Sequence, residues 1–160
     1  MDFMHDSLHD GHSLRILNVI DDCTREGLGM EIDFSLPSER VIRTLGNIIE
    51  WRGCPREIRC DNGPEYVSGA LNNWARKKGI HIVYIQPDKP CQNGYVERYN
   101  KTVRYGWLNQ HLFESLEEIQ EFATHWLWTY NNERPNMGAG GIPPAHKRAM
   151  AGLVSTSRLR

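Results

Sequence analysis

MDFMHDSLHDGHSLRILNVIDDCTREGLGMEIDF, residues 1–34, is the stretch that decides the fold. Three short apolar segments lie in it, separated by the Asp10-Gly11 turn signal and by the polar run 21–26. Short apolar runs bounded by turn residues are typical of antiparallel strands joined by hairpins. We therefore expect this stretch to form a meander of three antiparallel strands.

Beyond the meander the hydrophobic period changes to that of helices and single strands. Glycines end the first two helical patterns, and Ser115 with Glu118 forms a capping box at the start of the last one. The expected elements are a helix over 37–53, a strand over 57–60, a helix over 65–78, a strand over 80–85, a helix from near 94 and a helix from 115 to about 134.

The resulting order, β-β-β-α-β-α-β-α-α, defines the predicted fold class. Right-handed helical crossovers lay the fourth and fifth strands parallel to the first and beside it. We predict an α/β, ribonuclease H-like fold, with a mixed five-stranded sheet of three antiparallel and two parallel strands flanked by helices. The chain of 160 residues fits one domain over 1–148, and residues 149–160, which lack strong periodicity, are expected to form a flexible tail.

Composition excludes several functional classes. Nineteen basic against 20 acidic residues give a net charge of -1, so binding of nucleic acid must come from local charge. No apolar run approaches the roughly 18 residues of a membrane span, and no export leader is visible. The four cysteines form no CxxC pair, which favours reduced thiols and a cytoplasmic location.

Three acidic residues are placed by the predicted topology near one crevice. Asp2 lies in the first strand, and Asp61 lies at the end of the fourth, its neighbour. Glu97 lies in the helix that begins near Gly94, with 35 residues between it and Asp61. Carboxylates without histidine or thiol partners favour Mg²⁺ or Mn²⁺ and repel one another without a cation. Two such ions, roughly 3.5 to 4 Å apart, serve in-line phosphoryl transfer.

Other acidic residues compete for this assignment, because spacing alone does not exclude them. Asp10 fits a turn, the pair at 21 and 22 fits the end of a strand, and Glu65 fits the first turn of a helix. The competing set is Asp6, Asp10, Asp21, Asp22, Asp33 and Glu65.

Five segments carry a family resemblance: MDF (1–3), IRCDNGPEYVS (58–68), IQPDKPCQNGYVERYNKTVR (85–104), YNNERP (130–135) and GGIPPA (140–145). Over roughly residues 1–148 the chain resembles the integrase catalytic core (rve, DDE type) of bacterial insertion-sequence transposases. It is most similar to the second-frame protein of insertion sequence family three, whose cores are similar to retroviral integrases. The resemblance implies an Asp-Asp-Glu strand transferase in which Asp2, Asp61 and Glu97 hold two Mg²⁺ or Mn²⁺ ions.

The resemblance also implies partners and marks departures. The family acts on transposon ends and target DNA, here as a homo-oligomer such as a dimer, together with a first-frame helix-turn-helix protein, in the bacterial cytoplasm and nucleoid. It carries an upstream DNA-reading region, so this chain is expected to be a catalytic core without it. Asn136 stands where the family usually has histidine, and Cys91 where a small hydroxyl residue is usual.

Glu97, Lys101 and Arg104 share one face of the predicted helix, at i, i+4 and i+7. The functional interpretation is that the two cations hold DNA phosphates beside the metals. The alternative is a solvated face with a modest ion pair between Glu97 and Lys101. The full set of predicted DNA contacts is Lys101, Arg104, Arg98, Asn93, Gln92 and Asn100.

Some of these side chains have structural alternatives. Asn93 is equally suited to capping the helix that follows it. Tyr95 and Tyr99 would stack on an unpaired base or pack into the core. At the level of the whole chain, the alternatives to strand transfer are a structure-specific nuclease on the same fold, such as a resolvase or ribonuclease H, and an inactive DNA-binding remnant.

Overall fold

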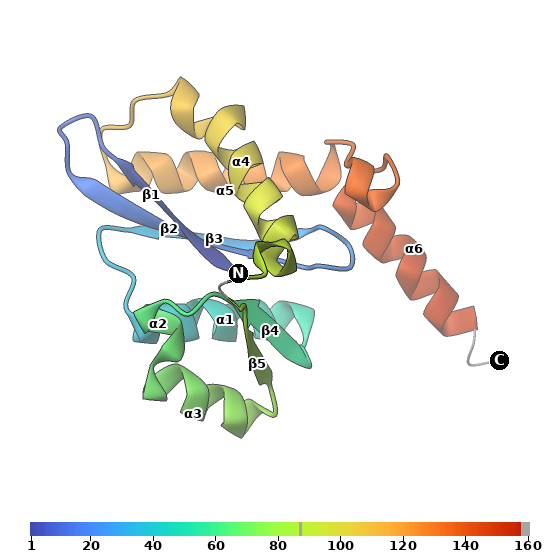
Figure 1. Ribbon diagram of the computed structural model, residues 1–160. Coiled ribbons are helices and arrows are strands. Elements are labelled where there is room, and N and C mark those ends of the chain that lie inside the picture. The colour runs from blue at the N-terminus through green and yellow to red at the C-terminus, as the bar shows by residue number, and fades with distance from the viewer. Residues whose placement is uncertain (87, 158–160) are drawn as a thin grey trace.

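The computed structural model describes residues 1–86 and 88–157, and its order of strands and helices follows the predicted one, except that the second predicted helix is divided in two and a further helix follows the last predicted one (Figure 1). The strands are β1 (Asp2–Ser7), β2 (Ser13–Ile20), β3 (Gly27–Asp33), β4 (Glu57–Cys60) and β5 (His81–Tyr84). The helices are α1 (Ser38–Arg52), α2 (Pro64–Val67), α3 (Gly69–Lys78), α4 (Gly94–Gly106), α5 (Leu116–Asn132) and α6 (Pro144–Ser157). Short 3₁₀ turns are η1 (Pro90–Asn93), η2 (Leu108–Gln110) and η3 (Met137–Ala139).

The strands form two sheets rather than one continuous sheet. β1, β2 and β3 pair antiparallel in that order, and β4 pairs with β5 in parallel. Between the sheets, the nitrogen of Met1 donates to the carbonyl of Arg59 at 2.8 Å. Two residues further on, the amide of Phe3 donates to Oδ1 of Asp2 at 2.9 Å instead of continuing a ladder to β4. The predicted α/β class is confirmed, and only the continuity of the sheet differs.

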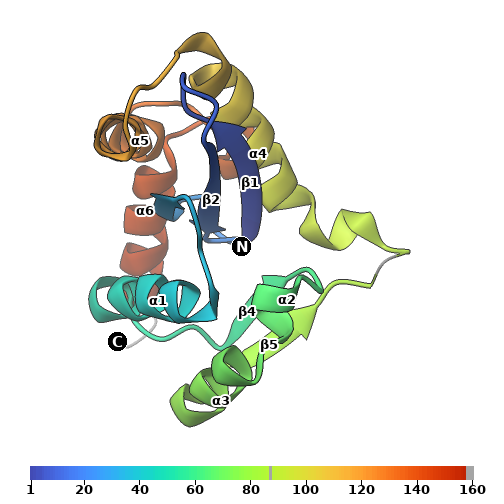
Figure 2. The same ribbon diagram turned by 90° about the vertical axis from the view of Figure 1, so that its left-hand side faces the viewer.

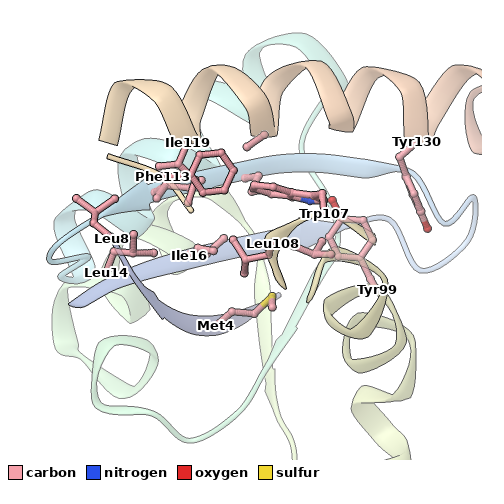
Figure 3. Packing of buried hydrophobic residues seen from close by; sticks show 14 residues of the cluster. Met4, Leu8, Leu14, Ile16, Tyr99, Trp107, Leu108, Phe113, Ile119 and Tyr130 are labelled. Carbon is pink, nitrogen blue, oxygen red and sulfur yellow. The ribbon is translucent and has the colours of Figure 1, made fainter. Parts of the chain in front are cut away.

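Two hydrophobic clusters lie on opposite faces of β2. On one face, residues of β1, β2 and β3 pack with residues of α4, η2 and α5 (Figures 2 and 3). Here Trp107 stacks on Phe122 at a centroid distance of 5.1 Å. On the other face, Leu17 and Val19 pack with residues of α1, α3 and β4. Burial on both faces makes β2 the central strand, which agrees with its nearly unbroken apolar run.

Two details of the helices differ from the prediction. The single helix expected over 65–78 is divided at Ser68, where the backbone is extended. The side chain of Ser68 caps α3, because its Oγ accepts a hydrogen bond from the amide of Leu71. The segment expected to be a flexible tail is helical, because α6 continues to Ser157, while residues 158–160 lie outside the described part. Pro144 in the first turn and the alanines that follow favour this helix.

All four cysteines are free thiols, and burial raises the pKa of Cys60 to about 12, so this thiol stays protonated at neutral pH. Across residues 1–86 and 88–157, no helix has both the length and the apolar character needed to cross a bilayer.

Candidate active site

Asp2, Asp61 and Glu97 line one cavity of about 380 Å³. Asp2 begins β1, Asp61 follows the last residue of β4, and Glu97 lies in the first turn of α4. The structure therefore brings together three side chains that are far apart in sequence. The other lining residues are Asn62, Gly63, Ile85, Gln86 and Asn93.

Asp2 is held by hydrogen bonds to both of its carboxylate oxygens. Oδ1 accepts from the amide of Phe3 at 2.9 Å, and Oδ2 accepts from Nδ2 of Asn100 at 2.8 Å. Oδ1 of Asn100 in turn accepts from Nδ2 of Asn18 at 2.8 Å. Because the register of β1 and β2 places Asn18 opposite Asp2, this network ties both strands to α4 at the site.

The electrostatic environment disfavours the charged form of Asp2. Burial raises the pKa of Asp2, and the hydrogen bond from the amide of Phe3 offsets part of that shift. The negative charges of Asp61 and Glu97 raise this pKa further. A cation among the three carboxylates would relieve both the burial cost and the mutual repulsion.

Asp61 is fixed by the turn that follows β4. Its Oδ1 accepts from the amide of Gly63 at 2.8 Å, and Nδ2 of Asn62 donates to the carbonyl of Ile85 at 3.1 Å. A Cβ atom on Gly63 would lie 2.9 Å from Oδ1 of Asp61, which is closer than such contacts occur. The glycine in DNGPE therefore allows the Asp61 carboxylate to lie against the backbone of the turn.

Glu97 is exposed, and its carboxylate has no hydrogen bond or ion pair within the described residues. In that same part of the chain, no three Asp, Glu, His or Cys side chains are close enough together to hold a metal ion as they stand. The donor set nevertheless fits Mg²⁺ or Mn²⁺, because the cavity offers carboxylate and amide oxygens and no histidine or thiol.

The competing carboxylates are all engaged elsewhere. Five of them form ion pairs with arginines and the sixth, Asp10, contacts Nδ1 of His12 at 2.8 Å. The arginine pairs are Asp6–Arg104, Asp21–Arg52, Asp22–Arg59, Asp33–Arg40 and Glu65–Arg15. The three cavity carboxylates have no such partner among residues 1–86 and 88–157, and this distinguishes them from the six alternatives.

The predicted DNA-binding face of α4 contains one unpaired and one engaged cation. Lys101 is exposed, and in the described part of the chain its ammonium makes no ion pair, so the alternative pair with Glu97 does not form. Arg104 instead reaches β1, where Nη1 lies 3.0 Å from Asp6 and Nη2 donates to the carbonyl of His5 at 2.6 Å.

The other predicted DNA contacts lie in different surroundings. Oε1 of Gln92 accepts from the amide of Gln86 at 3.2 Å, and the amide of Asn100 is used between Asn18 and Asp2. Asn93 is buried at the cavity and makes no side-chain cap, so the capping alternative is wrong. Arg98 is exposed and lines a neighbouring pocket.

The two tyrosines of α4 have different environments. Tyr99 is buried and meets Tyr130 edge-on at 5.1 Å, which confirms the packing alternative for this residue (Figure 3). Tyr95 is 48% exposed and carries the guanidinium of Arg25 over its ring at 3.3 Å.

Sequence reasoning missed Asn18 and Gly63, which position two of the three carboxylates. Asn18 is fully buried and, besides Arg15, is the second polar residue in the otherwise apolar run LRILNVI, which is the signal that could have marked it. The signal for Gly63 is its position two residues after Asp61, because an Asx turn favours glycine there.

The arrangement of an antiparallel three-stranded sheet and a parallel strand pair, flanked by helices, is a ribonuclease H-like fold of the integrase class. Two models described as integrase core domain match residues 1–90 and 78–144. The chain belongs to the integrase core domain family. Over 145 residues it is 39% identical to the insertion element IS476 uncharacterized 39.2 kDa protein of Xanthomonas euvesicatoria, covering 91% of this chain and 42% of that protein. The chain thus spans less than half the length of this relative.

Solved retroviral integrase cores share the fold. The catalytic core domain of BIV integrase aligns with a TM-score of 0.70 at 14% identity, over 97% of this chain and 96% of that one. The HTLV-2 integrase catalytic core domain in complex with magnesium, in a trimeric form, aligns with a TM-score of 0.67 at 18% identity, over 91% and 93% of the two chains. The predicted ribonuclease H-like fold and the resemblance to insertion-sequence integrase cores are confirmed.

Proposed function

We propose that this chain is the catalytic core of a DNA transposase that cuts DNA strands and joins them by metal-dependent transesterification, with Asp2, Asp61 and Glu97 as its catalytic carboxylates. The observation that carries the proposal is their convergence on one cavity in an integrase core domain. The pairing of every competing carboxylate supports the same choice.

The three carboxylates would hold Mg²⁺ or Mn²⁺, two ions in the working complex. The magnesium named with the HTLV-2 core and the all-oxygen donor set of the cavity support this assignment. When bound, such ions activate the attacking hydroxyl and stabilise the leaving oxygen. Asp2, fastened by Phe3 and Asn100, would supply the fixed part of the site, and Glu97 the mobile part.

Neither cleavage nor strand transfer needs an external energy source, because each step forms one bond to phosphorus and breaks another. In cleavage, a water oxygen attacks phosphorus, the bond to the 3′ oxygen breaks, and that oxygen takes up a proton to become a 3′ hydroxyl. In strand transfer, this 3′ hydroxyl attacks a target phosphodiester, a new bond to the target's 5′ phosphate forms, and the target's own 3′ oxygen leaves. One phosphodiester is exchanged for another.

DNA and further copies of the chain are the proposed partners. Lys101, which makes no ion pair with the residues that the structure describes, would hold a backbone phosphate beside Glu97, with Arg104, Gln92, Asn93 and Asn100 bordering the same strand. The trimeric form named for the HTLV-2 core supports a homo-oligomer. A first-frame helix-turn-helix protein would supply recognition of the transposon ends in the bacterial cytoplasm.

A branched DNA that mimics the joined product tests this function without needing recognition of transposon ends. By microscopic reversibility, a strand transferase lets the labelled 3′ hydroxyl at the branch attack the neighbouring phosphodiester, which yields a labelled strand longer than the input. We expect this product from the wild-type chain with Mn²⁺, and its loss in Asp61→Asn and Glu97→Gln. Asp22→Asn, which removes a paired carboxylate outside the cavity, is the matched control and should retain it.

The same gel separates the alternatives. Shortened labelled strands with no lengthened product would indicate a structure-specific nuclease. Binding of the branched DNA without any metal-dependent conversion would indicate an inactive remnant. Either outcome contradicts the strand-transfer proposal.

A further inference from the structure

A second pocket, of about 240 Å³, lies beside α4 and is lined by three arginines. Arg25 comes from the turn between β2 and β3, Arg98 from α4, and Arg134 from the end of α5. No acidic side chain lines this pocket among the residues that the structure describes. Three segments that are distant in sequence therefore form one positively charged pocket.

The three guanidinium groups lack the carboxylate partners that seven other arginines of the described residues have. In residues 1–86 and 88–157, none of these three forms an ion pair. Nη1 of Arg25 is buried with no hydrogen-bond partner within that part of the chain. A buried, unsatisfied donor is costly, and three neighbouring cations repel, so the pocket is suited to an anion.

Tyr130 also lines the pocket, and two of these positive charges act on its hydroxyl. Burial raises the pKa of the Tyr130 hydroxyl, and the positive charges of Arg134 and Arg25 lower it. Arg98 and Arg134 are exposed, so a ligand can reach them from solvent.

The pocket adjoins the carboxylate cavity around α4. Glu97 faces the cavity and the next residue, Arg98, lines the pocket. Successive helical residues point about 100° apart, so the two sites occupy neighbouring faces of one helix. A polymer with repeating negative charges can touch both sites at once.

We propose that the pocket of Arg25, Arg98 and Arg134 binds a backbone phosphate of the DNA strand whose neighbouring phosphodiester occupies the carboxylate cavity. This assignment rests on the proposed function, since it takes DNA as the substrate. Guanidinium groups suit the role because their planar donor pairs match two phosphate oxygens at once. The phosphate would satisfy the unpaired Nη1 of Arg25 and neutralise the three charges.

The test is DNA binding by the full chain, measured as fluorescence anisotropy of a labelled duplex in EDTA over a series of salt concentrations. Arg98→Gln and Arg134→Gln should each weaken binding about tenfold at low salt and flatten the plot of log K against log salt by about 0.9. Arg56→Gln removes an exposed arginine outside the pocket and should leave the slope unchanged. Melting temperatures equal to wild type show that each variant is folded.

Two outcomes overturn the assignment while leaving the proposed function intact. One is that wild type binds DNA and the Arg98 and Arg134 variants keep the slope of Arg56→Gln. The other is that inorganic phosphate raises the melting temperature of wild type but not of Arg134→Gln, while both proteins bind DNA equally well. That result would mean that the pocket binds a free anion and not DNA. Conversely, reduced slopes in a chain that never converts branched DNA support the pocket and refute the proposed function.

Discussion

Asn100 donates a hydrogen bond of 2.8 Å to Oδ2 of Asp2, and the same side-chain amide accepts from Asn18. Asn100 lies three residues after Glu97 on α4. The helix that carries the third carboxylate is therefore fastened to the strand that carries the first. Because Asn18 is fully buried in β2, this hydrogen-bond network begins in the hydrophobic core.

Asn100→Ala should lower the activity and the Mn²⁺ affinity of the site while the chain stays folded. It leaves Oδ2 of Asp2 and Nδ2 of Asn18 without this partner, which costs about 1 to 3 kcal/mol in the free energy of unfolding. Conversion of branched DNA should fall about 10- to 100-fold, and the Mn²⁺ concentration for half-maximal activity should rise. Asn132→Ala, which removes an amide bonded within α5, is the control. An unchanged Mn²⁺ requirement in Asn100→Ala would refute the positioning role.

Gly63→Ala should displace the Asp61 carboxylate without unfolding the chain. The added Cβ would lie 2.9 Å from Oδ1 of Asp61, and a side-chain carboxylate can move away where backbone cannot. We expect weaker Mn²⁺ binding by calorimetry and lower activity, with a melting temperature near that of wild type. Gly46→Ala in α1 meets open space and should gain about 0.5 to 1 kcal/mol with full activity. Equal Mn²⁺ affinity in Gly63→Ala and wild type would contradict the crowding argument.

The raised pKa of Asp2 predicts a pH-dependent stability in the absence of divalent ions. Burial and the nearby negative charges raise this pKa, so the folded state releases the proton at a higher pH than the unfolded state. Wild type therefore loses stability as pH rises from the ordinary value near 4 through the raised one. Asp2→Asn has no such loss.

Urea unfolding of both proteins in EDTA, from pH 3.5 to 8, measures this effect. The unfolding free energy of Asp2→Asn minus that of wild type should increase with pH across the window and then level off. A difference that stays constant with pH would show that the environment of Asp2 does not disfavour its charge.

Lys101→Ala should weaken binding to all DNA sequences alike and flatten the salt dependence by about 0.9 in slope, because a phosphate contact carries no sequence information. Arg104→Ala should also lower the free energy of unfolding by about 1 kcal/mol, since it removes the contacts to Asp6 and to the carbonyl of His5. Anisotropy and urea titrations separate the two effects. Unchanged DNA binding in both variants would mean that this face is only solvated.

Much of the fold was predictable because local signals coincide with element borders. The strand over 57–60 and the helix capped by Ser115 are confirmed, since turn residues and the capping box mark them directly. The break at Ser68 was missed because the apolar pattern continues across it. The separation of the two sheets depends on where the amide of Phe3 donates, which periodicity does not reveal.

The site was predictable in part for a different reason. Topology places Asp2 beside the end of β4, and the motif spacing selects Asp61 and Glu97, so their shared cavity follows from the order of elements. The role of Asn18 depends on Asn100, 82 residues away, and one sequence carries no sign of such a pair. The pocket of three arginines likewise requires the α5–η3 connection to fold back beside α4.

A crystal of the full chain soaked in Mn²⁺, with the ions located by anomalous scattering, tests the central claim most directly. We expect a Mn²⁺ ion held jointly by Asp2 and Asp61, with carboxylate oxygens at about 2.1 Å, and Glu97 turned toward the cavity to complete the ligand set. Mn²⁺ bound instead at one of the six competing carboxylates, with the cavity of Asp2, Asp61 and Glu97 left empty at saturating Mn²⁺, would contradict the claim.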